Sequence, residues 1–458
     1  MTTLVDRPLA TKPPTPATAS PAGARPGAVF AVILAGAVAV VGLWWQNTTS
    51  ITGMGEWLIN AGRVTGLLAG YGVVVLVALM ARIPPLERGI GADKLARWHA
   101  MGGRYTVSLV VAHGLLIIWG YAVQAHTDVV SQTGTLITSY PDVLMASVGG
   151  LLLVGVAIVS VRAARRRLRY ETWHFLHLYT YLAVALAFSH QFSTGAEFID
   201  NRPARFVWSL LYIGVATAIV WYRFAVPVRQ TVRHRMRVHS VHFEAPGVVS
   251  ILVTGRHLHE LAAQAGQFFR WRFLTRELWW AANPYSLSAA PRENLLRVTV
   301  KDLGDHSAAL MRLQPGTRVL TEGPYGAMTS ARRRNRKVLL VAGGIGITPL
   351  RALFEALPGG PGDVTLLYRA SHERDVVFRD ELVAIAKQRG AHLHVLTGNR
   401  AQLGHDPLSA GALAARVPEL REHDVYICGP DPMARSVIAA LRKAKLPRRQ
   451  IHHESFQF

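Results

Sequence analysis

Two apolar segments of the chain each carry a pair of widely spaced histidines. In "WHAMGGRYTVSLVVAHGLLIIW", His99 and His113 are fourteen positions apart, which places them about 21 Å apart and within about 40° of one face of an α-helix. In "ETWHFLHLYTYLAVALAFSHQF", His177 and His190 are thirteen positions apart, or about 20 Å. Titratable side chains inside such segments are rare and usually functional. The spacings predict two stacked centres, His99 with His177 and His113 with His190.

Two levels of paired imidazoles inside a helical bundle suit two six-coordinate haems. An iron with both axial positions filled by histidine carries electrons more readily than it binds ligands. The single cysteine, Cys428, excludes an intramolecular disulfide and a thiolate-ligated cluster. Thirteen residues rotate an ideal helix by about 220°, so we expect a π-bulge, a bend or ligation from different sides in the second segment. Histidines that are merely hydrogen-bonded within the bundle are the alternative.

Three further polar residues accompany these histidines. We expect His174 beside the ligands or at the membrane interface and His126 in an outer loop, although either could replace a neighbour as ligand. Arg63 begins the second apolar segment on the outer side. It would extend to the interface, pair with a haem propionate, or attract an anionic electron acceptor or product.

The composition is that of a membrane protein. Of 458 residues, 50% are hydrophobic and only 17% are charged. Six segments are long and apolar enough to span a bilayer, namely 29–45, 58–81, 98–121, 143–161, 172–192 and 206–222. The net charge of +22 comes with no nucleic-acid recognition module, so we expect no nucleic-acid partner.

Basic residues predict the orientation of these spans. They cluster between the second and third spans and between the fourth and fifth, whereas 125–143 contains no Lys or Arg. The clusters are Arg82, Arg88, Lys94 and Arg97, then Arg162, Arg165, Arg166, Arg167 and Arg169. Because cytoplasmic loops carry the positive charge, we expect a multi-pass protein of the inner (plasma) membrane with both termini in the cytoplasm.

After Pro227 the pattern changes to short alternating strands and then to strand–helix units, so this half should be soluble. Its motifs occur in a specific order: "NPYSLSAAP", "VTVKDLGDHSAAL", "GPYGAM", "VAGGIGITPLRAL", "YRASHERD", "CGPDPM" and the terminal "HHESFQF". In this order the chain resembles the ferredoxin–NADP reductase superfamily. The resemblance implies a six-strand flavin-binding barrel followed by a nucleotide-binding α/β domain.

The physical properties of these motifs agree with the resemblance. Tyr285 can lie flat on an isoalloxazine, and Ser286 can hydrogen-bond to its polar edge. Free N–H groups of a helix that begins near Gly304 would suit a pyrophosphate. The glycine loop around Gly344 lies between a strand and a helix, so its backbone can approach phosphates closely, and Thr348 can add a hydroxyl.

The resemblance implies a larger set of site residues. Contacts to FAD or nucleotide are expected from Asn283, Pro284, Tyr285, Ser286, Leu287, Gly304, His306, Ser307, Gly344, Gly346, Thr348, Pro349, Arg369, Ser371, Arg374, Gly429, Pro430, Glu454 and Phe458. Tyr285, Ser286, Cys428 and Phe458 would act at the reaction centre, with Cys428 lining the nicotinamide pocket and Phe458 shielding the flavin.

Two details modify the resemblance. The superfamily often has Arg or His where this chain has Asn283, which removes the usual first flavin contact of the motif. Arg369, Ser371 and Arg374 follow a strand where a 2′-phosphate would lie, and therefore favour NADPH over NADH.

Nearly all of 28–458 resembles the ferric reductase and NADPH oxidase superfamily of transmembrane haem flavoproteins, whose histidine spacings are also fourteen and thirteen. Residues 1–27 are rich in Pro, Ala and Thr without a hydrophobic period, which predicts a disordered cytoplasmic tail. The rest of the chain, by the resemblance, has three parts: a six-helix transmembrane haem domain at 28–228, an FAD-binding antiparallel β-barrel at 229–331, and an NAD(P)-binding Rossmann-like α/β domain at 332–458. The resemblance also implies two b-type haems.

The implied activity is electron transfer from NAD(P)H through FAD and the haems to a small acceptor beyond the outer face. A ferric chelate, oxygen, a quinone and other acceptors stay open. Apart from the lipid bilayer and this acceptor, we expect no obligate partner. The alternatives are a haem-free, membrane-anchored flavin reductase and a transporter with a nucleotide-sensing domain.

Overall fold

The computed structural model describes residues 23–48, 51–161, 167–168, 170–398, 404 and 406–454. Most of the predicted disordered tail, 1–27, lies outside this range, and Pro26 and Gly27 already belong to the first helix. The chain forms two compact units. We call Ala24–Leu86 with Lys94–Arg223 the helical unit, and Phe224–Phe458 with Glu87–Asp93 the mixed unit.

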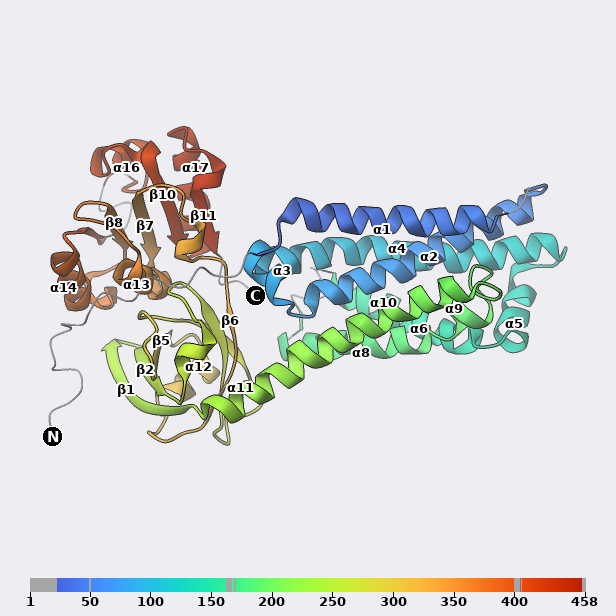
Figure 1. Ribbon diagram of the computed structural model, residues 1–458, viewed down its shortest axis with the longest axis horizontal. Helices are drawn as coiled ribbons and strands as arrows, with labels where there is room; N and C mark the ends of the chain where they lie inside the picture. The colour runs from blue at the N-terminus through green and yellow to red at the C-terminus, as the bar shows by residue number, and fades with distance from the viewer. Residues whose placement is uncertain are drawn as a thin grey trace. The chain divides into compact units, whose positions relative to one another are not determined.

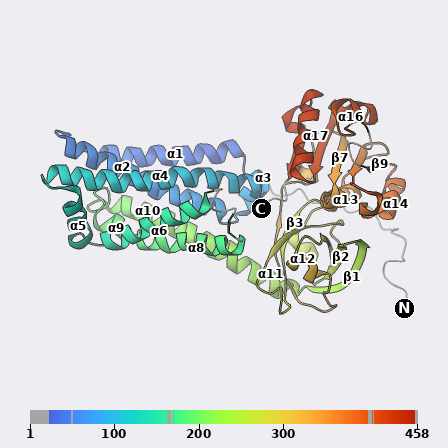
Figure 2. The same ribbon diagram turned by 180° about the vertical axis from the view of Figure 1, so that it is seen from behind.

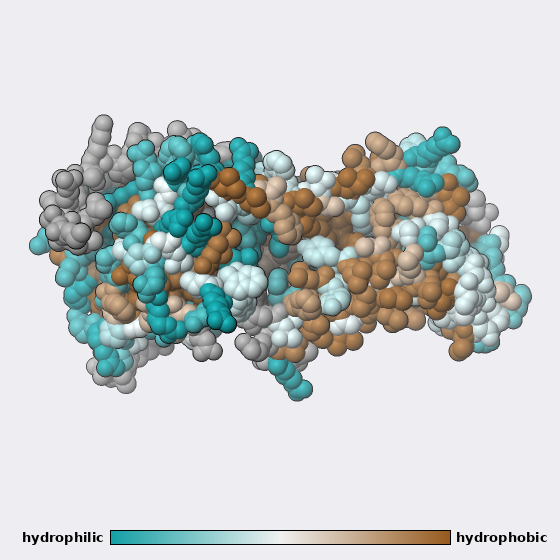
Figure 3. All heavy atoms as spheres, turned by 90° about the horizontal axis from the view of Figure 1, so that it is seen from below, coloured by the Kyte–Doolittle hydropathy of each residue, from teal (hydrophilic) through white to brown (hydrophobic). Residues whose placement is uncertain are grey.

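The helical unit consists of long apolar helices that run alongside one another (Figure 1, Figure 2). Its helices are α1 (Pro26–Gln46), α2 (Met54–Met80), α4 (Ala92–Gln124), α5 (Val129–Ser139), α6 (Val143–Ser160), α8 (Tyr170–Leu186), α9 (His190–Ser193) and α10 (Arg202–Val220), and α3 (Pro84–Ile90) begins in it. Apolar residues cover most of the visible flank of this unit (Figure 3). Such a surface is stable only in contact with lipid or other apolar partners, which agrees with a membrane protein.

Among the described residues, five helices are long and apolar enough to cross a membrane. They correspond to five of the six predicted spans, and the exception is the predicted span 172–192. There α8 has 17 residues and ends at Leu186. The predicted count of six spanning helices is therefore not confirmed.

The interruption after α8 lies between two of the predicted ligands, His177 and His190. The Phe188 N–H donates to the Ala185 carbonyl at 3.3 Å, and the Gln191 N–H donates to the Phe188 carbonyl at 3.3 Å. These three-residue hydrogen bonds tighten the turn relative to an α-helix. They interrupt the regular α-helix in the part of the chain where the thirteen-residue spacing predicts a bulge or a bend.

The mixed unit begins with helix α11 (Val226–His234) and two three-stranded antiparallel sheets. One sheet has the order β1-β2-β5 and the other β4-β3-β6. Their bounds are β1 Arg237–Ala245, β2 Val248–Thr254, β3 Phe268–Phe273, β4 Asn283–Ser286, β5 Leu295–Lys301 and β6 Val319–Tyr325. A shared core includes the fully buried Phe269, Trp271 and Val298. The expected six strands are present, but closure into a barrel is not confirmed, because the ladders form separate sheets.

The rest of the mixed unit is a parallel five-stranded sheet with the order β11-β10-β7-β8-β9. The strands are β7 Lys337–Gly343, β8 Val364–Arg369, β9 His392–Leu396, β10 His423–Cys428 and β11 Ile451–Glu454. The main helices are α13 (Ile347–Ala356), α14 (Arg379–Arg389), α16 (Ala410–Arg416) and α17 (Asp431–Lys443), and the short α12 is Asp305–Leu310.

Helices cover both faces of this sheet. Alternate residues of β7 enter two different cores, Leu340 with Leu353 of α13, and Leu339 with Val437 of α17. A parallel sheet with both faces buried needs near-continuous apolar strands, as "KVLLVAG" provides. The carboxyl ends of β7 and β10 are adjacent, and nucleotides bind at such edges in α/β folds.

Asp424 on β10 stabilises the segment that leads into this sheet. Its side chain is fully buried and accepts hydrogen bonds from the N–H groups of Arg334 (2.7 Å) and Asn335 (2.5 Å). The other carboxylate oxygen lies 3.1 Å from His452 Nε2. The segment before β7 is thus tied to the sheet through its backbone.

We expect Asp424→Ala to lower the free energy of unfolding of the mixed unit by about 2 kcal/mol, because two backbone donors lose a charged acceptor. Asp424→Asn keeps an acceptor oxygen and should cost less. Thermal unfolding of the intact chain, followed by tryptophan fluorescence, measures both. Glu422→Ala, which breaks an exposed ion pair with Lys337, is the control, and an Asp424→Ala midpoint no lower than that of the control would contradict the expectation.

Candidate functional site

The four predicted ligand histidines lie as two facing pairs in the helical unit. The ring centroids of His99 on α4 and His177 on α8 are 5.9 Å apart. Those of His113 on α4 and His190 at the start of α9 are 6.3 Å apart. The structure therefore brings together the same pairs that the spacing predicts.

Backbone carbonyls fix three of these rings. Each of His99, His113 and His190 has its Nδ1 within hydrogen-bond distance of a carbonyl oxygen. The carbonyls are those of Leu76, Gly62 and Ala187, at 3.1, 2.8 and 2.5 Å. In the tautomer that carries its proton on Nδ1, that nitrogen donates to the carbonyl, and Nε2 keeps its lone pair. This is the arrangement of histidines that bind metals through Nε2.

The separation of the rings fits one metal ion between each pair. Two metal–nitrogen bonds of about 2 Å, plus about 1 Å from each nitrogen to its ring centroid, give roughly 6 Å. The measured separations are 5.9 and 6.3 Å. Among the described residues, no group of three or more His, Cys, Asp or Glu could hold a metal ion. A ligand set of two imidazoles suits haem, whose macrocycle supplies the other donors.

Glycines on α2 leave room for the outer pair. A Cβ atom added to Gly66 would lie 2.5 Å from Nδ1 of His113, and one added to Gly62 would lie 2.8 Å from Ile117. Any side chain at Gly62 or Gly66 would displace residues of α4, namely Ile117 or His113. Small residues at four-residue spacing are typical of membrane helices whose backbones approach closely.

Arg63 forms an ion pair that the sequence did not suggest. Its Nε donates to Glu197 Oε1 at 2.8 Å, and its Nη1 donates to Asn60 Oδ1 at 2.8 Å. The Glu197 side chain is only 3% exposed. The charge of Arg63 is therefore balanced by a protein carboxylate, which weakens the expectation that Arg63 attracts an anionic acceptor.

The other two histidines of the helical unit lie outside the pairs. His174 is exposed on α8, with its ring 6.4 Å from that of Trp173. His126 is exposed just after α4 and has a left-handed backbone with φ 51°. Neither ring takes the place of a paired histidine.

In the mixed unit the predicted flavin motif forms β4 and its continuation. Tyr285 pairs with Phe269 of β3, and its carbonyl accepts a hydrogen bond from Trp271 Nε1 at 2.9 Å. Burial raises the pKa of the Tyr285 hydroxyl to about 12. Ser286 and Leu287 are buried, so the end of the motif lies inside the mixed unit.

The structure brings Asn283 and His306 into contact although they are distant in sequence. The Asn283 amide nitrogen lies 2.8 Å from His306 Nδ1. Ser307 Oγ accepts from the Leu303 N–H at 2.7 Å and donates to the Gly304 carbonyl at 2.8 Å. The predicted pyrophosphate loop is thus closed by its own hydroxyl and adjoins the flavin motif.

The glycine loop packs against the end of β10. A Cβ atom added to Gly346 would lie 2.5 Å from the carbonyl carbon of Cys428 and 2.7 Å from the nitrogen of Gly429. Gly344 has φ +53°, a left-handed conformation that favours glycine. The Thr348 hydroxyl donates to the Ile345 carbonyl at 3.0 Å, so it also stabilises the loop.

Residues at the end of β10 and β11 complete this edge. Cys428 is fully buried, and burial raises the pKa of its thiol well above the usual range. It is therefore a neutral thiol at physiological pH. A Cβ atom added to Gly326, which follows β6, would lie 3.2 Å from Glu454 Oε1, so the flavin-motif side and β11 approach each other. Phe458 lies outside the described residues.

The three residues expected to select NADPH are differently engaged. Arg369 donates hydrogen bonds to the carbonyls of Ala370, Leu396 and Gly398. Arg374 is exposed in a short 3₁₀-helix, and Ser371 is exposed just before it. Arg369 thus contacts protein backbone, while Arg374 extends into solvent.

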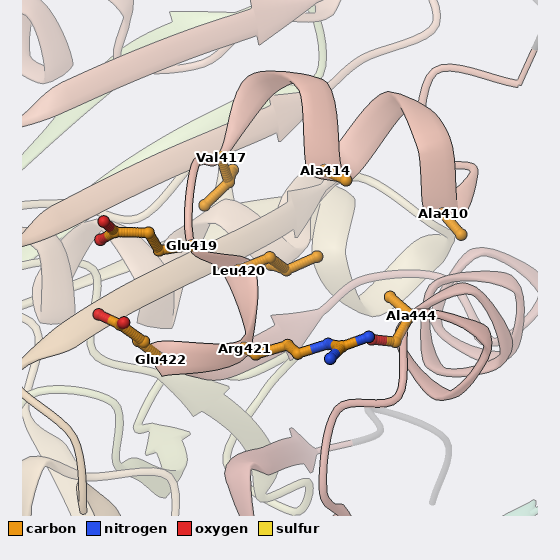
Figure 4. A pocket seen from close by; sticks show the side chains of 8 residues that line it. All are labelled: Ala410, Ala414, Val417, Glu419, Leu420, Arg421, Glu422 and Ala444. Carbon is orange, nitrogen blue, oxygen red and sulfur yellow. The ribbon is translucent and has the colours of Figure 1, made fainter.

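A shallow pocket elsewhere in the mixed unit does not involve the predicted site. It is formed by α16, the turn before β10 and the end of α17 (Figure 4). Its lining residues are Ala410, Ala414, Val417, Glu419, Leu420, Arg421, Glu422 and Ala444. Arg421 donates to the Ala444 carbonyl at 3.1 Å and so bridges its edge. None of these residues belongs to the motifs above.

Comparison with known proteins also distinguishes a transmembrane part of the chain from a nucleotide-binding part. Residues 65–188 match the ferric reductase like transmembrane component, and residues 340–438 match the oxidoreductase NAD-binding domain. Ferredoxin–NADP reductase B of Sorangium cellulosum is 32% identical over 191 residues, which cover 38% of this chain and 77% of that protein. The chain is a ferredoxin–NADP reductase family member fused to a ferric reductase-like transmembrane domain.

Other members of this reductase family are also similar. The ferredoxin reductase component of 3-ketosteroid-9-alpha-monooxygenase from Mycobacterium tuberculosis is 34% identical over 197 residues. The match covers 42% of this chain and 54%, about half, of that relative. Among solved structures, the ferredoxin reductase in carbazole 1,9a-dioxygenase has a TM-score of 0.41 and 23% identity, with 49% of this chain and 69% of that one covered.

We expect Gly346→Ala to weaken NADP⁺ binding by about 10- to 100-fold, and Gly346→Val by more. The added carbon would push the loop off the Cys428–Gly429 backbone and remove one N–H contact to phosphate, worth about 1.5–3 kcal/mol. Isothermal titration with NADP⁺ measures the affinity.

The matched control is Gly411→Ala, because a Cβ atom there meets no described atom within 4 Å. An unchanged NADP⁺ affinity in both Gly346 variants would show that the loop does not bind the nucleotide.

Proposed function

We propose that the chain is a transmembrane NAD(P)H oxidoreductase of the plasma membrane. It transfers electrons from cytoplasmic NAD(P)H through FAD and two b-type haems to an extracytoplasmic acceptor, a ferric chelate or molecular oxygen. The observation that carries this proposal is the presence of two facing histidine pairs at two levels of one bundle, with separations that suit one metal ion each. The fused reductase module supplies a source of electrons.

The histidine pairs would hold the haems. His99 and His177 are the ligands of the inner centre, and His113 and His190 those of the outer centre. When bound, the flavin converts a two-electron hydride donor into a one-electron donor, and the haems carry single electrons. The carbonyls that accept from Nδ1 of His99, His113 and His190 would hold these three rings in the orientation that directs Nε2 to the metal.

Residues of the mixed unit would bind and orient the flavin and the nucleotide. Tyr285 offers its ring face to the isoalloxazine, and Ser286 a hydroxyl to its polar edge. The N–H groups of the glycine loop and of α13 bind the nucleotide phosphates. The loop touches the Cys428–Gly429 backbone, so nicotinamide would be held beside the neutral Cys428 thiol.

Electrostatics supports the proposed orientation and cofactor preference. Arg82, Arg88, Lys94 and Arg97 lie between α2 and the apolar part of α4, and such a cluster supports a cytoplasmic location for that end. The exposed Arg374 beside the second strand of the nucleotide-binding sheet favours NADPH, because a guanidinium pairs well with a 2′-phosphate.

The haem and flavin content of the purified protein tests the proposal. We expect two haems and one FAD per chain, with the absorbance spectrum of low-spin haem that has two histidine ligands. Protein that contains FAD but no haem would contradict the proposal and would indicate a membrane-anchored flavin reductase.

We expect His113→Ala or His190→Ala to reduce the haem content from two to one per chain. The loss should leave the rate of flavin reduction by NADPH unchanged, since the mixed unit contains that chemistry. Haem quantification and anaerobic stopped-flow absorbance measure the two quantities. Retention of two low-spin haems in both variants would refute the ligand assignment.

We also expect Gly66→Ala to weaken haem binding at the outer level only. Its Cβ would lie 2.5 Å from His113 Nδ1, so the imidazole must move away from its partner. Gly114→Ala is the matched control, because a Cβ atom there meets no described atom within 4 Å. A Gly66→Ala protein with two haems of unchanged spectrum and midpoint potential would show that the close contact is not required.

A further inference from the structure

We propose that five residues form a clamp that sets the position of the nucleotide loop relative to the flavin motif. The clamp consists of Arg297, Arg351, Glu355, Phe378 and Glu381. This inference rests on the proposed function, because it assigns the clamp a role in hydride transfer between the nicotinamide and the flavin. None of the five belongs to the residues expected to bind the cofactors, so they are positioning residues.

The first half of the clamp ties α13 to the chain that continues the flavin motif. Helix α13 begins at Ile347, directly after the glycine loop, and carries Arg351 and Glu355 one turn apart. Arg351 Nη1 donates to the Ser288 carbonyl at 3.2 Å, and Glu355 Oε2 accepts from the Ala290 N–H at 2.9 Å. Ser288 and Ala290 follow Ser286 by two and four residues. The glycine loop and the flavin motif are thus joined through one turn of α13 and the few residues that follow β4.

Glu381 on α14 is the centre of the second half. It accepts two hydrogen bonds from Arg297 of β5, at 2.8 and 2.9 Å, and one from Arg351 Nε at 2.8 Å. Burial raises the pKa of Glu381, but the hydrogen bonds and charges of the two arginines outweigh this effect, and the pKa is lowered. Glu381 therefore stays ionised. It binds two guanidinium groups at once, that of Arg297 on β5 and that of Arg351 on α13.

Arg351 makes the clamp dependent on all its members. It is only 3% exposed, and it also pairs with Glu355 at 2.5 Å. A buried charge that loses its partner is strongly destabilising, whereas two arginines and two glutamates together are neutral. The four charges are therefore stable only when the flavin-motif segment, α13 and α14 are in register.

Phe378 gives independent support for the clamp. It precedes α14 with φ +64°, a left-handed conformation that is costly for a bulky side chain. Its ring is buried and lies 4.7 Å from the Arg297 guanidinium carbon and 6.0 Å from that of Arg351. Cations over an aromatic face are attracted to it, most strongly when they are shielded from water. Backbone strain of this kind persists where the surroundings demand a particular side-chain position.

The clamp matters because hydride transfer requires close alignment of donor and acceptor. A displacement of about 1 Å can lower the rate of such a step by about 100-fold. The nucleotide phosphates and the isoalloxazine would be bound by the two segments that the clamp joins. Loosening the clamp should therefore slow hydride transfer more than it weakens the binding of either cofactor.

The test compares Arg351→Lys and Arg351→Met with the wild type in the intact, FAD-loaded protein. Lysine keeps the charge but not the two-sided hydrogen-bonding fork. We measure FAD content, the affinity for NADP⁺, and the anaerobic rate of flavin reduction by NADPH and by its 4-deuterated form. We expect FAD content and NADP⁺ affinity within about twofold of the wild type, with flavin reduction slowed about 10-fold in the lysine variant and about 100-fold in the methionine variant. In both variants hydride transfer should limit the rate of flavin reduction, so the primary deuterium isotope effect on that step should be fully expressed.

Arg233→Met is the matched control, because Arg233 makes a similar two-bond pair with Glu260 on the exposed surface of the same unit. It should reduce the flavin at the wild-type rate. If Arg351→Met does not fold, Glu355→Ala decides. It removes the acceptor for the Ala290 N–H and one partner of Arg351 but leaves the pair of Arg351 with Glu381, and it should slow flavin reduction by about fivefold to tenfold.

Three results are distinguishable. A wild-type protein that binds no FAD would refute the proposed function itself. An FAD-loaded Arg351→Met or Glu355→Ala protein with a wild-type rate of flavin reduction would refute the clamp alone. Slower reduction accompanied by an equal loss of NADP⁺ affinity would also refute it, because the residue would then act in binding rather than in positioning.

Discussion

The proposed haem sites require that two imidazole rings face each other at a fixed distance, at two levels of a helical bundle. This requirement explains several otherwise separate features of the helical unit. Backbone carbonyls orient three of the rings through Nδ1. Gly66 has no side chain because His113 occupies the space that a Cβ atom would need. The α-helix is interrupted between Leu186 and His190, and the His190 ring faces His113 although thirteen residues separate His190 from His177.

The proposed function sets a second requirement for the mixed unit, the alignment of two bound ligands. Gly346 lies against the Cys428–Gly429 backbone, and Gly326 lies against Glu454. Each contact joins segments that the sequence separates widely. The buried network around Arg351 and Glu381 adds charge pairs that are stable only in one arrangement. Glycines thus permit close approach, and the charged network fixes it.

Features set by local spacing could be predicted from the sequence. The pairing of His99 with His177 follows from helix geometry and span order, because the rise per residue fixes the separation within each helix and the third and fifth spans run in the same direction. The apolar strand "KVLLVAG" before a glycine loop predicts a parallel sheet with a phosphate-binding edge, and the family comparison agrees. The number of spanning helices was predicted less well, because hydropathy does not detect that α8 ends at Leu186.

Features set by long-range contacts could not be predicted. Glu197 is 134 residues from Arg63, and in the sequence it looks like an ordinary loop carboxylate. Arg297 and Glu381 are 84 residues apart, and each resembles a solvated charge until the fold places them together. Asn283 suggested a missing flavin contact, whereas the structure adds that His306 adjoins it. Such pairs depend on which surfaces meet, and a single sequence contains no direct record of that.

The central claim is that electrons from NADPH cross the membrane through the helical unit. The most direct measurement uses sealed vesicles that contain the purified protein, with ferricyanide trapped inside and NADPH added outside under anaerobic conditions. The account predicts that trapped ferricyanide is reduced by the wild type and that His113→Ala abolishes this reduction while NADPH still reduces the flavin. Flavin reduction without any reduction of trapped ferricyanide by the wild type would contradict it.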